Sequence, residues 1–169
     1  MRRDVGAICV AVWLLAAVQV LAQAKPDFSG TWVVDTTKGS PADAALGMQG
    51  HFPKLTISIR QTDTTLTFEA KTAGGPGSTT IYKLDGSESR NPQPVPGSAG
   101  KMNLAYRSTW VGDKLVTTIA PPGSAGSLFK ETLYLDGNEL IQETDPGDSD
   151  ASQVMAPPGA KLKLYFKRG

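Results

Sequence analysis

The sequence has very few of the side chains on which metal sites and nucleophilic active sites depend. Its 169 residues include one histidine, His51, and one cysteine, Cys9. The usual zinc sites need several His or Cys ligands, so a single residue of each type excludes them. Cys9 lies in an apolar run near the N-terminus, and no thiol follows it. We therefore expect no metal, no cofactor and no disulfide in the folded protein.

An excess of charge of one sign is also missing. The chain has 17 Lys and Arg residues against 16 Asp and Glu residues, and the basic residues are scattered. Binding of nucleic acid or of an anionic membrane surface needs a basic face. No glycine-rich loop follows a strand and opens a helix, which is the pattern of a phosphate-binding site. These absences argue against nucleic acids and nucleotides as partners.

Long apolar runs are absent except at the N-terminus. Met1 to Arg3 is basic, Val5 to Leu21 is almost continuously apolar, and Ala22 to Ala24 has the small-x-small pattern of a cleavage site. A membrane crossing needs about 20 apolar residues, and no second run follows. We expect residues 1–24 to be a cleaved signal peptide, with no transmembrane segment after cleavage, and the protein to be periplasmic or secreted. Residues 25–169 then have the length of one domain.

Most of this domain alternates between apolar and polar residues. The alternation runs from Lys54 to Arg60 and resumes from Thr65 to Ala70. A period of two is typical of antiparallel strands with one face in water, and the Asp-Gly dipeptides that follow later strands are strong turn signals. With a first strand around Gly30, we predict eight or nine strands. The others are expected at Thr79–Leu84, Met102–Trp110, Lys114–Ile119, Leu128–Leu135, Glu139–Thr144 and Lys161–Lys167.

One short segment has helical signals. Ser40 suits an N-cap, Pro41 suits the first helical position, and Gly47 ends the segment. We predict one short helix after the first strand, lying across one mouth of the fold as a connector or a lid. Three segments rich in Pro, Gly and Ser are expected to be loops. They are 86–100, 120–127 and 145–160.

The fold class follows from the way such strands protect their edges. Closing an antiparallel meander into a barrel removes its edges, and sequential strands with short turns favour an up-and-down barrel. A two-sheet sandwich is the alternative, because the three loops are long enough to cross between sheets. Closure would place the first strand, with Gly30 and Trp32, beside the last strand, with Phe166 and Arg168. The indole would then plug one end, the glycine would admit another backbone, and a terminal cation would stack on the indole.

The segment from Asp27 to Asp35, followed by Lys38, resembles the opening of lipocalin-like and fatty-acid-binding-like barrels. It is most similar to an exported bacterial lipocalin-like family of the calycin type. That resemblance implies a calycin-like barrel that binds a lipophilic small molecule. The chain departs from fatty-acid-binding proteins in lacking a two-helix lid and an identifiable Arg-Tyr clamp for a carboxylate. Later motifs of the resemblance are Leu55–Ile57, Tyr82–Gly86, Trp110–Leu115, Asp136–Leu140 and Phe166–Arg168.

Three functions compete on these residues. The first is an exported carrier or sensor of a lipophilic ligand, without catalysis. The second is a structural or interaction module of the cell envelope with a filled core. The third is a barrel enzyme that uses His51 as a base, although no nucleophile elbow is present. A calcium site among the acidic residues of 145–150 lacks the spacing of an EF-hand.

The ligand hypothesis needs a cavity with a mixed lining. Large side chains expected to point inward combine apolar area with hydroxyl or N–H groups that orient the polar end of a ligand. The same side chains would fill the core if no cavity exists. The predicted lining consists of Phe68, Tyr82, Tyr106 and Trp110.

Overall fold

The part of the chain that the structure describes consists of β-strands and their connections. The computed structural model describes residues 24–38, 55–73, 77–94, 100–124, 126–146 and 161–169. No helix occurs within these ranges, and the short helix predicted at Ser40–Gly47 lies outside them. The strands are β1 (Gly30–Val34), β2 (Thr56–Gln61), β3 (Thr65–Lys71), β4 (Ser78–Lys83), β5 (Glu88–Pro94), β6 (Lys101–Val111), β7 (Lys114–Ala120), β8 (Phe129–Asp136), β9 (Glu139–Pro146) and β10 (Leu162–Arg168).

No helix among the described residues is long and apolar enough to cross a bilayer.

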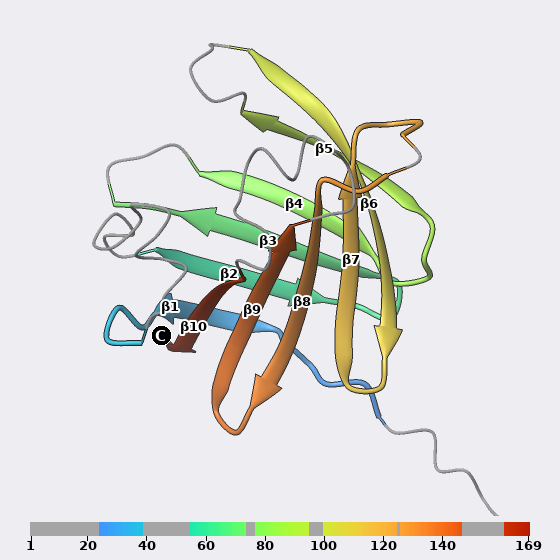
Figure 1. Ribbon diagram of the computed structural model, residues 1–169. Coiled ribbons are helices and arrows are strands. Elements are labelled where there is room, and N and C mark those ends of the chain that lie inside the picture. The colour runs from blue at the N-terminus through green and yellow to red at the C-terminus, as the bar shows by residue number, and fades with distance from the viewer. Residues whose placement is uncertain (1–23, 39–54, 74–76, 95–99, 125, 147–160) are drawn as a thin grey trace, which may run out of the picture.

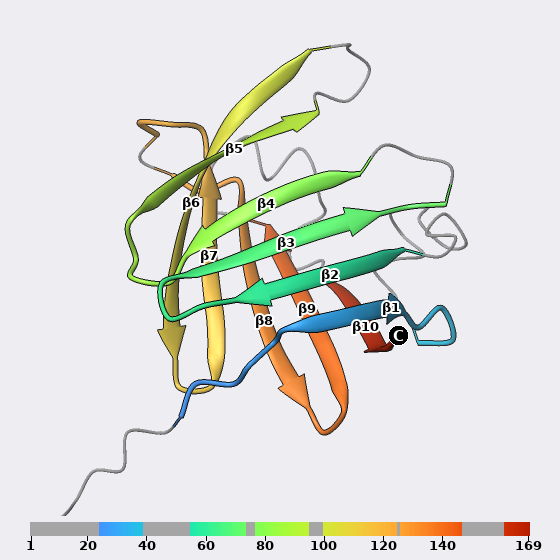
Figure 2. The ribbon, with the colours of Figure 1, turned by 180° about the vertical axis from the view of Figure 1, so that it is seen from behind.

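All ten strands belong to one antiparallel sheet with the order β4-β3-β2-β1-β10-β9-β8-β7-β6-β5. The first strand pairs with the last, with Trp32 opposite Arg168 and Val34 opposite Phe166. Strands β1–β4 cross strands β7–β10 steeply, so the sheet curls into a nearly closed barrel (Figures 1 and 2). The predicted up-and-down meander and its first-to-last pairing are confirmed. The alternative with two separate sheets is not found.

The seam of the barrel lies between β4 and β5, which stand at the two ends of the strand order. Side chains of β5 bridge this seam in place of a backbone ladder. The amide of Asn91 accepts a hydrogen bond from the Ile81 N–H (2.8 Å) and donates one to the Ile81 carbonyl (3.0 Å). The hydroxyl of Ser89 donates to the same carbonyl (2.6 Å). Ser89 and Asn91 are both buried, so they satisfy backbone groups that would otherwise lack partners.

The described residues form ten strands, more than the predicted eight or nine, because the predicted loop 86–100 contains β5. Its buried positions carry Ser89 and Asn91, so the strand has no apolar alternation to detect. It also contains Pro92 and Pro94. Proline is tolerated because β5 forms a backbone ladder only with β6, as an edge strand does.

The core lies inside the barrel and follows the predicted alternation. Ile57 and Ile59 of β2 and Leu66 and Phe68 of β3 are buried, as the sequence pattern required. Phe166 of β10 is fully buried. Burial of these apolar side chains is the main stabilising contribution in a domain without a disulfide.

The segment before β1 covers one end of the barrel, next to the β6–β7 hairpin (Figure 1). Phe28 is fully buried and stacks on Trp110 with ring centroids 5.7 Å apart. The Trp32 indole donates a hydrogen bond to the Phe28 carbonyl (2.9 Å). Gln61 holds the same segment, because its side chain accepts from the Phe28 N–H and donates to the Pro26 carbonyl. This end of the barrel is therefore closed by the segment before β1 and by the side chains that hold it.

The C-terminal strand completes the closed end. The Arg168 guanidinium lies 4.1 Å from the centroid of the Trp32 ring and donates a hydrogen bond to the Ser29 carbonyl (2.7 Å). A Cβ built on Gly30 would collide with this guanidinium. The glycine was expected to admit another backbone, but it admits an arginine side chain. Gly30 also has a φ of 135°, a conformation that other residues rarely adopt.

Candidate functional site

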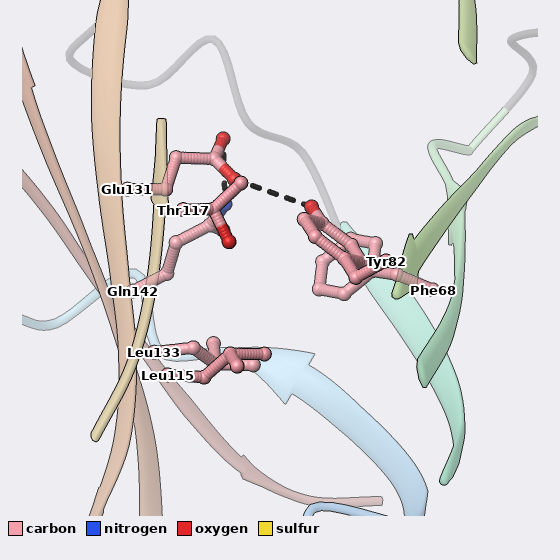
Figure 3. Close-up of a pocket in the computed structure, with 7 residues that line it drawn as sticks. All are labelled: Phe68, Tyr82, Leu115, Thr117, Glu131, Leu133 and Gln142. Atoms are coloured by element: carbon pink, nitrogen blue, oxygen red, sulfur yellow. Dashed lines mark hydrogen bonds between the residues drawn. The ribbon is translucent and has the colours of Figure 1, made fainter. Parts of the chain in front are cut away.

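A small cavity lies inside the barrel between two facing walls. Phe68 of β3 and Tyr82 of β4 form one wall, and side chains of β7, β8 and β9 form the other (Figure 3). Its volume is about 10 Å³, which is close to the least that holds one water molecule. The residues that line it are Phe68, Tyr82, Leu115, Thr117, Glu131, Leu133 and Gln142.

A row of polar residues crosses the inner face beside this cavity. The strand registers place Ser108 of β6 opposite Thr117 of β7, Thr117 opposite Glu131 of β8, and Glu131 opposite Thr144 of β9. The buried hydroxyls of Thr117 and Ser108 hydrogen-bond to each other (2.8 Å). We call Ser108, Thr117, Glu131 and Thr144 the polar row. It is unusual because the inner faces of these strands are otherwise mainly apolar.

Glu131 is the charged member of the polar row and connects the two walls. Its Oε2 accepts a hydrogen bond from the Tyr82 hydroxyl across the cavity (3.2 Å), and its Oε1 accepts one from Nε2 of Gln142 (3.3 Å) (Figure 3). Both contacts are long for hydrogen bonds. Each carboxylate oxygen has two lone pairs, so each can accept a further hydrogen bond.

The environment shifts the titration of these groups. Burial raises the pKa of the Glu131 carboxyl above its usual value, while the hydrogen bonds from Tyr82 and Gln142 lower it in part. Burial, and then the neighbouring Glu131 carboxylate, raises the pKa of the Tyr82 hydroxyl well above 10. Tyr82 therefore stays protonated near neutral pH and remains a hydrogen-bond donor to Glu131.

Glu131 is half-buried, and no basic side chain among the described residues is buried beside it. All described Lys and Arg residues are exposed except Lys163, which is half-buried. Lys163 donates to the Tyr134 hydroxyl (3.0 Å) and pairs with Glu143 (2.9 Å). None of the ion pairs formed within the described ranges includes Glu131. The inner acidic group thus lacks a protein cation within this part of the chain.

The predicted lining residues have different positions. Phe68 and Tyr82 line the cavity. Tyr106 is buried and packs edge-on against Tyr82, with centroids 5.7 Å apart, but it is not a lining residue of this cavity. Trp110 lies instead at the closed end against Phe28, with the Lys25 ammonium 5.5 Å from its ring centroid.

The polar lining residues Thr117, Glu131 and Gln142 were missed at the sequence level. A signal was present, because Glu131 stands at the apolar phase of Phe129-x-Glu131-x-Leu133, and Gln142 is two residues after the buried Leu140. A charged residue rarely occupies an inward position of a strand without a reason, even when it is only half-buried as Glu131 is. Their proximity to Tyr82 depends on the barrel, since Tyr82 and Glu131 are 49 positions apart.

The described residues contain no group of three or more His, Cys, Asp or Glu side chains that could hold a metal ion. His51 and most of the acidic segment 145–150 lie outside the described residues. Asp145 is described and pairs with Lys161 (3.0 Å). The polar groups that line the cavity are the Glu131 carboxyl, the Gln142 amide, the Thr117 hydroxyl and the Tyr82 phenol, and all of them can form hydrogen bonds.

Comparisons with known proteins rest on structure. No family model and no curated protein sequence matches this chain. Human cRBP IV has a similar structure, with a TM-score of 0.60, 18% identity, and coverage of 85% of this chain and 99% of its own. Human cRBP IV is a calycin barrel of the lipocalin and fatty-acid-binding type. This chain has the calycin fold.

Two further calycins agree with that assignment. Lipid binding protein 8 (LBP-8) of Caenorhabditis elegans matches with a TM-score of 0.56 and 13% identity, over 84% of this chain and 95% of its own. A secretary abundant heat soluble (SAHS) protein of Ramazzottius varieornatus matches with a TM-score of 0.59 and 15% identity, over 88% of this chain and 99% of its own. The resemblance inferred from the opening motif is confirmed as a likeness of fold.

Proposed function

We propose that this calycin binds a lipophilic small molecule inside its barrel, between the wall of Phe68 and Tyr82 and the wall of β7–β9. The observation that carries the proposal is the inward carboxyl of Glu131 in an otherwise mainly apolar interior. Even the partial burial of the Glu131 carboxyl costs free energy that an apolar residue would not cost. Such groups are typical of functional sites, where a few polar groups orient a mainly apolar ligand.

The fold supports this proposal. The calycin from Caenorhabditis elegans with a similar structure is named a lipid binding protein. Binding requires the walls to separate, because the cavity of about 10 Å³ holds no more than a water molecule. Phe68 and Tyr82 touch edge-on, with centroids 6.3 Å apart, and rotation of either ring would enlarge the cavity. Rotamer changes of this kind are common on binding.

The size of the cavity favours a second candidate, an interaction module with a filled core. Pockets for small molecules usually measure about 300–1,000 Å³. The mutual packing of Phe68, Tyr82 and Tyr106 fills much of the interior. In this alternative the protein would contact its partners through its outer surface and would bind no ligand within.

Titration with the neutral fluorescent probe N-phenyl-1-naphthylamine decides between the two candidates. The ligand-binding proposal expects saturable binding of one probe per chain. Leu133→Phe should weaken this binding by about tenfold, because it fills the cavity with extra atoms. Val111→Phe is the matched control, since Val111 is 62% exposed at the β6–β7 turn.

A filling variant can also fail to fold, so an enlarging variant completes the test. Phe68→Ala removes one of the two rings that form the first wall and should tighten probe binding, because less of the space has to be opened. If the wild-type protein shows no saturable binding, and Phe68→Ala creates none, the filled-core candidate replaces the ligand-binding one.

We also propose export, on the basis of the basic start, the apolar run and the Ala22–Ala24 site described above. The carrier or sensor would then work in the periplasm or outside the cell. Mass spectrometry of the protein purified from its own cells tests this. The expected mass is that of a chain beginning at Lys25, and a mass that includes residues 1–24 would contradict it.

A further inference from the structure

The polar row suggests which chemical group the ligand carries, an inference that rests on the proposed function. The interior offers hydrogen-bond acceptors around one carboxyl and no described basic side chain. A ligand carboxylate would therefore meet an acid in place of an arginine or lysine. Two carboxylates that meet in a mainly apolar interior repel each other strongly.

The two oxygens of Glu131 have capacity for a further donor. Each accepts one long hydrogen bond, from Tyr82 at 3.2 Å and from Gln142 at 3.3 Å. Neither partner carries a positive charge. Charge-assisted hydrogen bonds between an ammonium and a carboxylate are shorter and about twice as strong as neutral ones. A cationic donor would thus supply both the missing hydrogen bond and the missing counter-charge.

We propose that Glu131 receives the polar end of a lipophilic amine, which lies in the barrel with its ammonium at the polar row and its hydrocarbon part among Phe68, Leu115 and Leu133. The hydroxyl of Thr117, opposite Glu131 in the strand register, is a neighbouring acceptor for a second N–H. The raised pKa of Glu131 falls when the ammonium binds, because an adjacent positive charge favours the carboxylate.

Isothermal titration calorimetry at pH 7 with decylamine, decanol and decanoic acid, all below their micelle concentrations, tests the assignment. The three probes share one chain length and differ only in the polar end. Decylamine should bind at least about tenfold more tightly than decanoic acid, with decanol between them. Equal affinities, or tighter binding of the acid or the alcohol, would overturn the assignment of an amine.

Glu131→Gln and the control Glu143→Gln locate the effect. Both variants remove one carboxylate, but Glu143 is a partner of Lys163 and Tyr134 and does not line the cavity. Glu131→Gln should reduce the advantage of decylamine over decanol by about tenfold. Glu143→Gln should leave it unchanged. Loss of the advantage in both variants, or in neither, contradicts a specific role of Glu131.

Decyltrimethylammonium separates charge from hydrogen bonding without a variant. It carries the same charge as decylamine but no N–H donor, so it should bind about tenfold more weakly to the wild-type protein. Equal binding would show that no donor is recognised and would overturn the inference. If none of the four decyl probes and no N-phenyl-1-naphthylamine binds, the proposed function itself fails. Binding in the wrong order refutes only the amine.

Discussion

Gly30 and Arg168 meet at the closed end of the barrel, although 138 positions separate them in the chain. The glycine has a φ of 135°, and the space beside its Cα is occupied by the Arg168 guanidinium. The guanidinium is in turn held over the Trp32 ring. The absence of a side chain at position 30 is therefore a requirement of both the backbone and the packing.

Gly30→Ala should lower the free energy of unfolding by about 1–3 kcal/mol, because the new methyl group strains the backbone and displaces Arg168. Urea unfolding of Gly30→Ala, Arg168→Ala and the double variant separates the two causes. The double variant should lose less unfolding free energy than the two single variants lose together. Arg168→Ala removes the collision with the new methyl group but leaves the backbone strain. A Gly30→Ala protein as stable as the wild type would contradict this account.

Asp35, at the end of β1, is a buried carboxylate with several partners. It pairs with Lys167 (2.7 Å) and accepts hydrogen bonds from the hydroxyl and N–H of Thr37. These contacts, with Lys167 first, lower the pKa of Asp35 from 3.8 to about 2. A carboxyl with a lowered pKa stabilises the fold above its unfolded pKa.

The stabilisation by Asp35 should be complete above about pH 4 and should disappear as the pH falls through about 2. Asp35→Asn is therefore expected to lower the urea midpoint at pH 6, and its difference from the wild type should shrink towards pH 2. Urea unfolding at a series of pH values measures this, with Asp113→Asn in the β6–β7 turn as the control. A difference that grows on acidification would contradict the sign.

Among the neighbouring strands, β4 and β5 have the weakest connection. Strand β5 forms a ladder with β6 alone and reaches β4 through Ser89 and Asn91. Side-chain hydrogen bonds at a seam are fewer than those of a full ladder, so β4 and β5 should separate more readily than the other neighbouring strands.

Asn91→Ala should destabilise the protein by about 1–3 kcal/mol, because the partly buried N–H and C=O of Ile81 lose a partner. Hydrogen exchange of the Ile81 amide should accelerate more than exchange at the β8–β9 ladder. Arg90→Ala, on the exposed face of the same strand, is the control and should change neither. Equal acceleration in β4 and in β8–β9 would mean that the seam does not open locally.

For the whole molecule, one continuous sheet predicts one cooperative transition. The contact of β1 with β10 closes the meander, and Phe166 beside this contact is fully buried. Loss of the Phe166 ring leaves a cavity between strands from the two ends of the chain. The consequence should reach every strand, because none has a core of its own.

Phe166→Ala should lower the free energy of unfolding by about 3–5 kcal/mol. Far-UV circular dichroism and tryptophan fluorescence should report the same shifted urea midpoint. Val111→Ala, at an exposed turn position, should stay within about 0.5 kcal/mol of the wild type. Two separate midpoints in Phe166→Ala would show that the barrel unfolds in parts.

Much of this fold can be read from local pattern. Alternation of apolar and polar residues, together with the opening motif for β1, located nine of the ten strands, since most inward residues must be apolar where a barrel has a core. The exception, β5, satisfies its inward positions by hydrogen bonds to a neighbouring strand, and such bonds leave no periodicity in a single sequence. The opening motif and the turns were sufficient to predict an up-and-down closure.

The candidate site depended on the three-dimensional arrangement. Glu131 and Gln142 are visible as polar residues at inward phases, but only the register of β6 to β9 aligns the polar row, and only the curvature of the sheet brings Tyr82 across to it. The register and curvature of the sheet also determine where the seam lies, and they bring Arg168 into the space beside Gly30. Alternation specifies which face a side chain takes, because it is a property of one strand. Which side chains meet is a property of strands far apart in the chain, and closure of the sheet decides it.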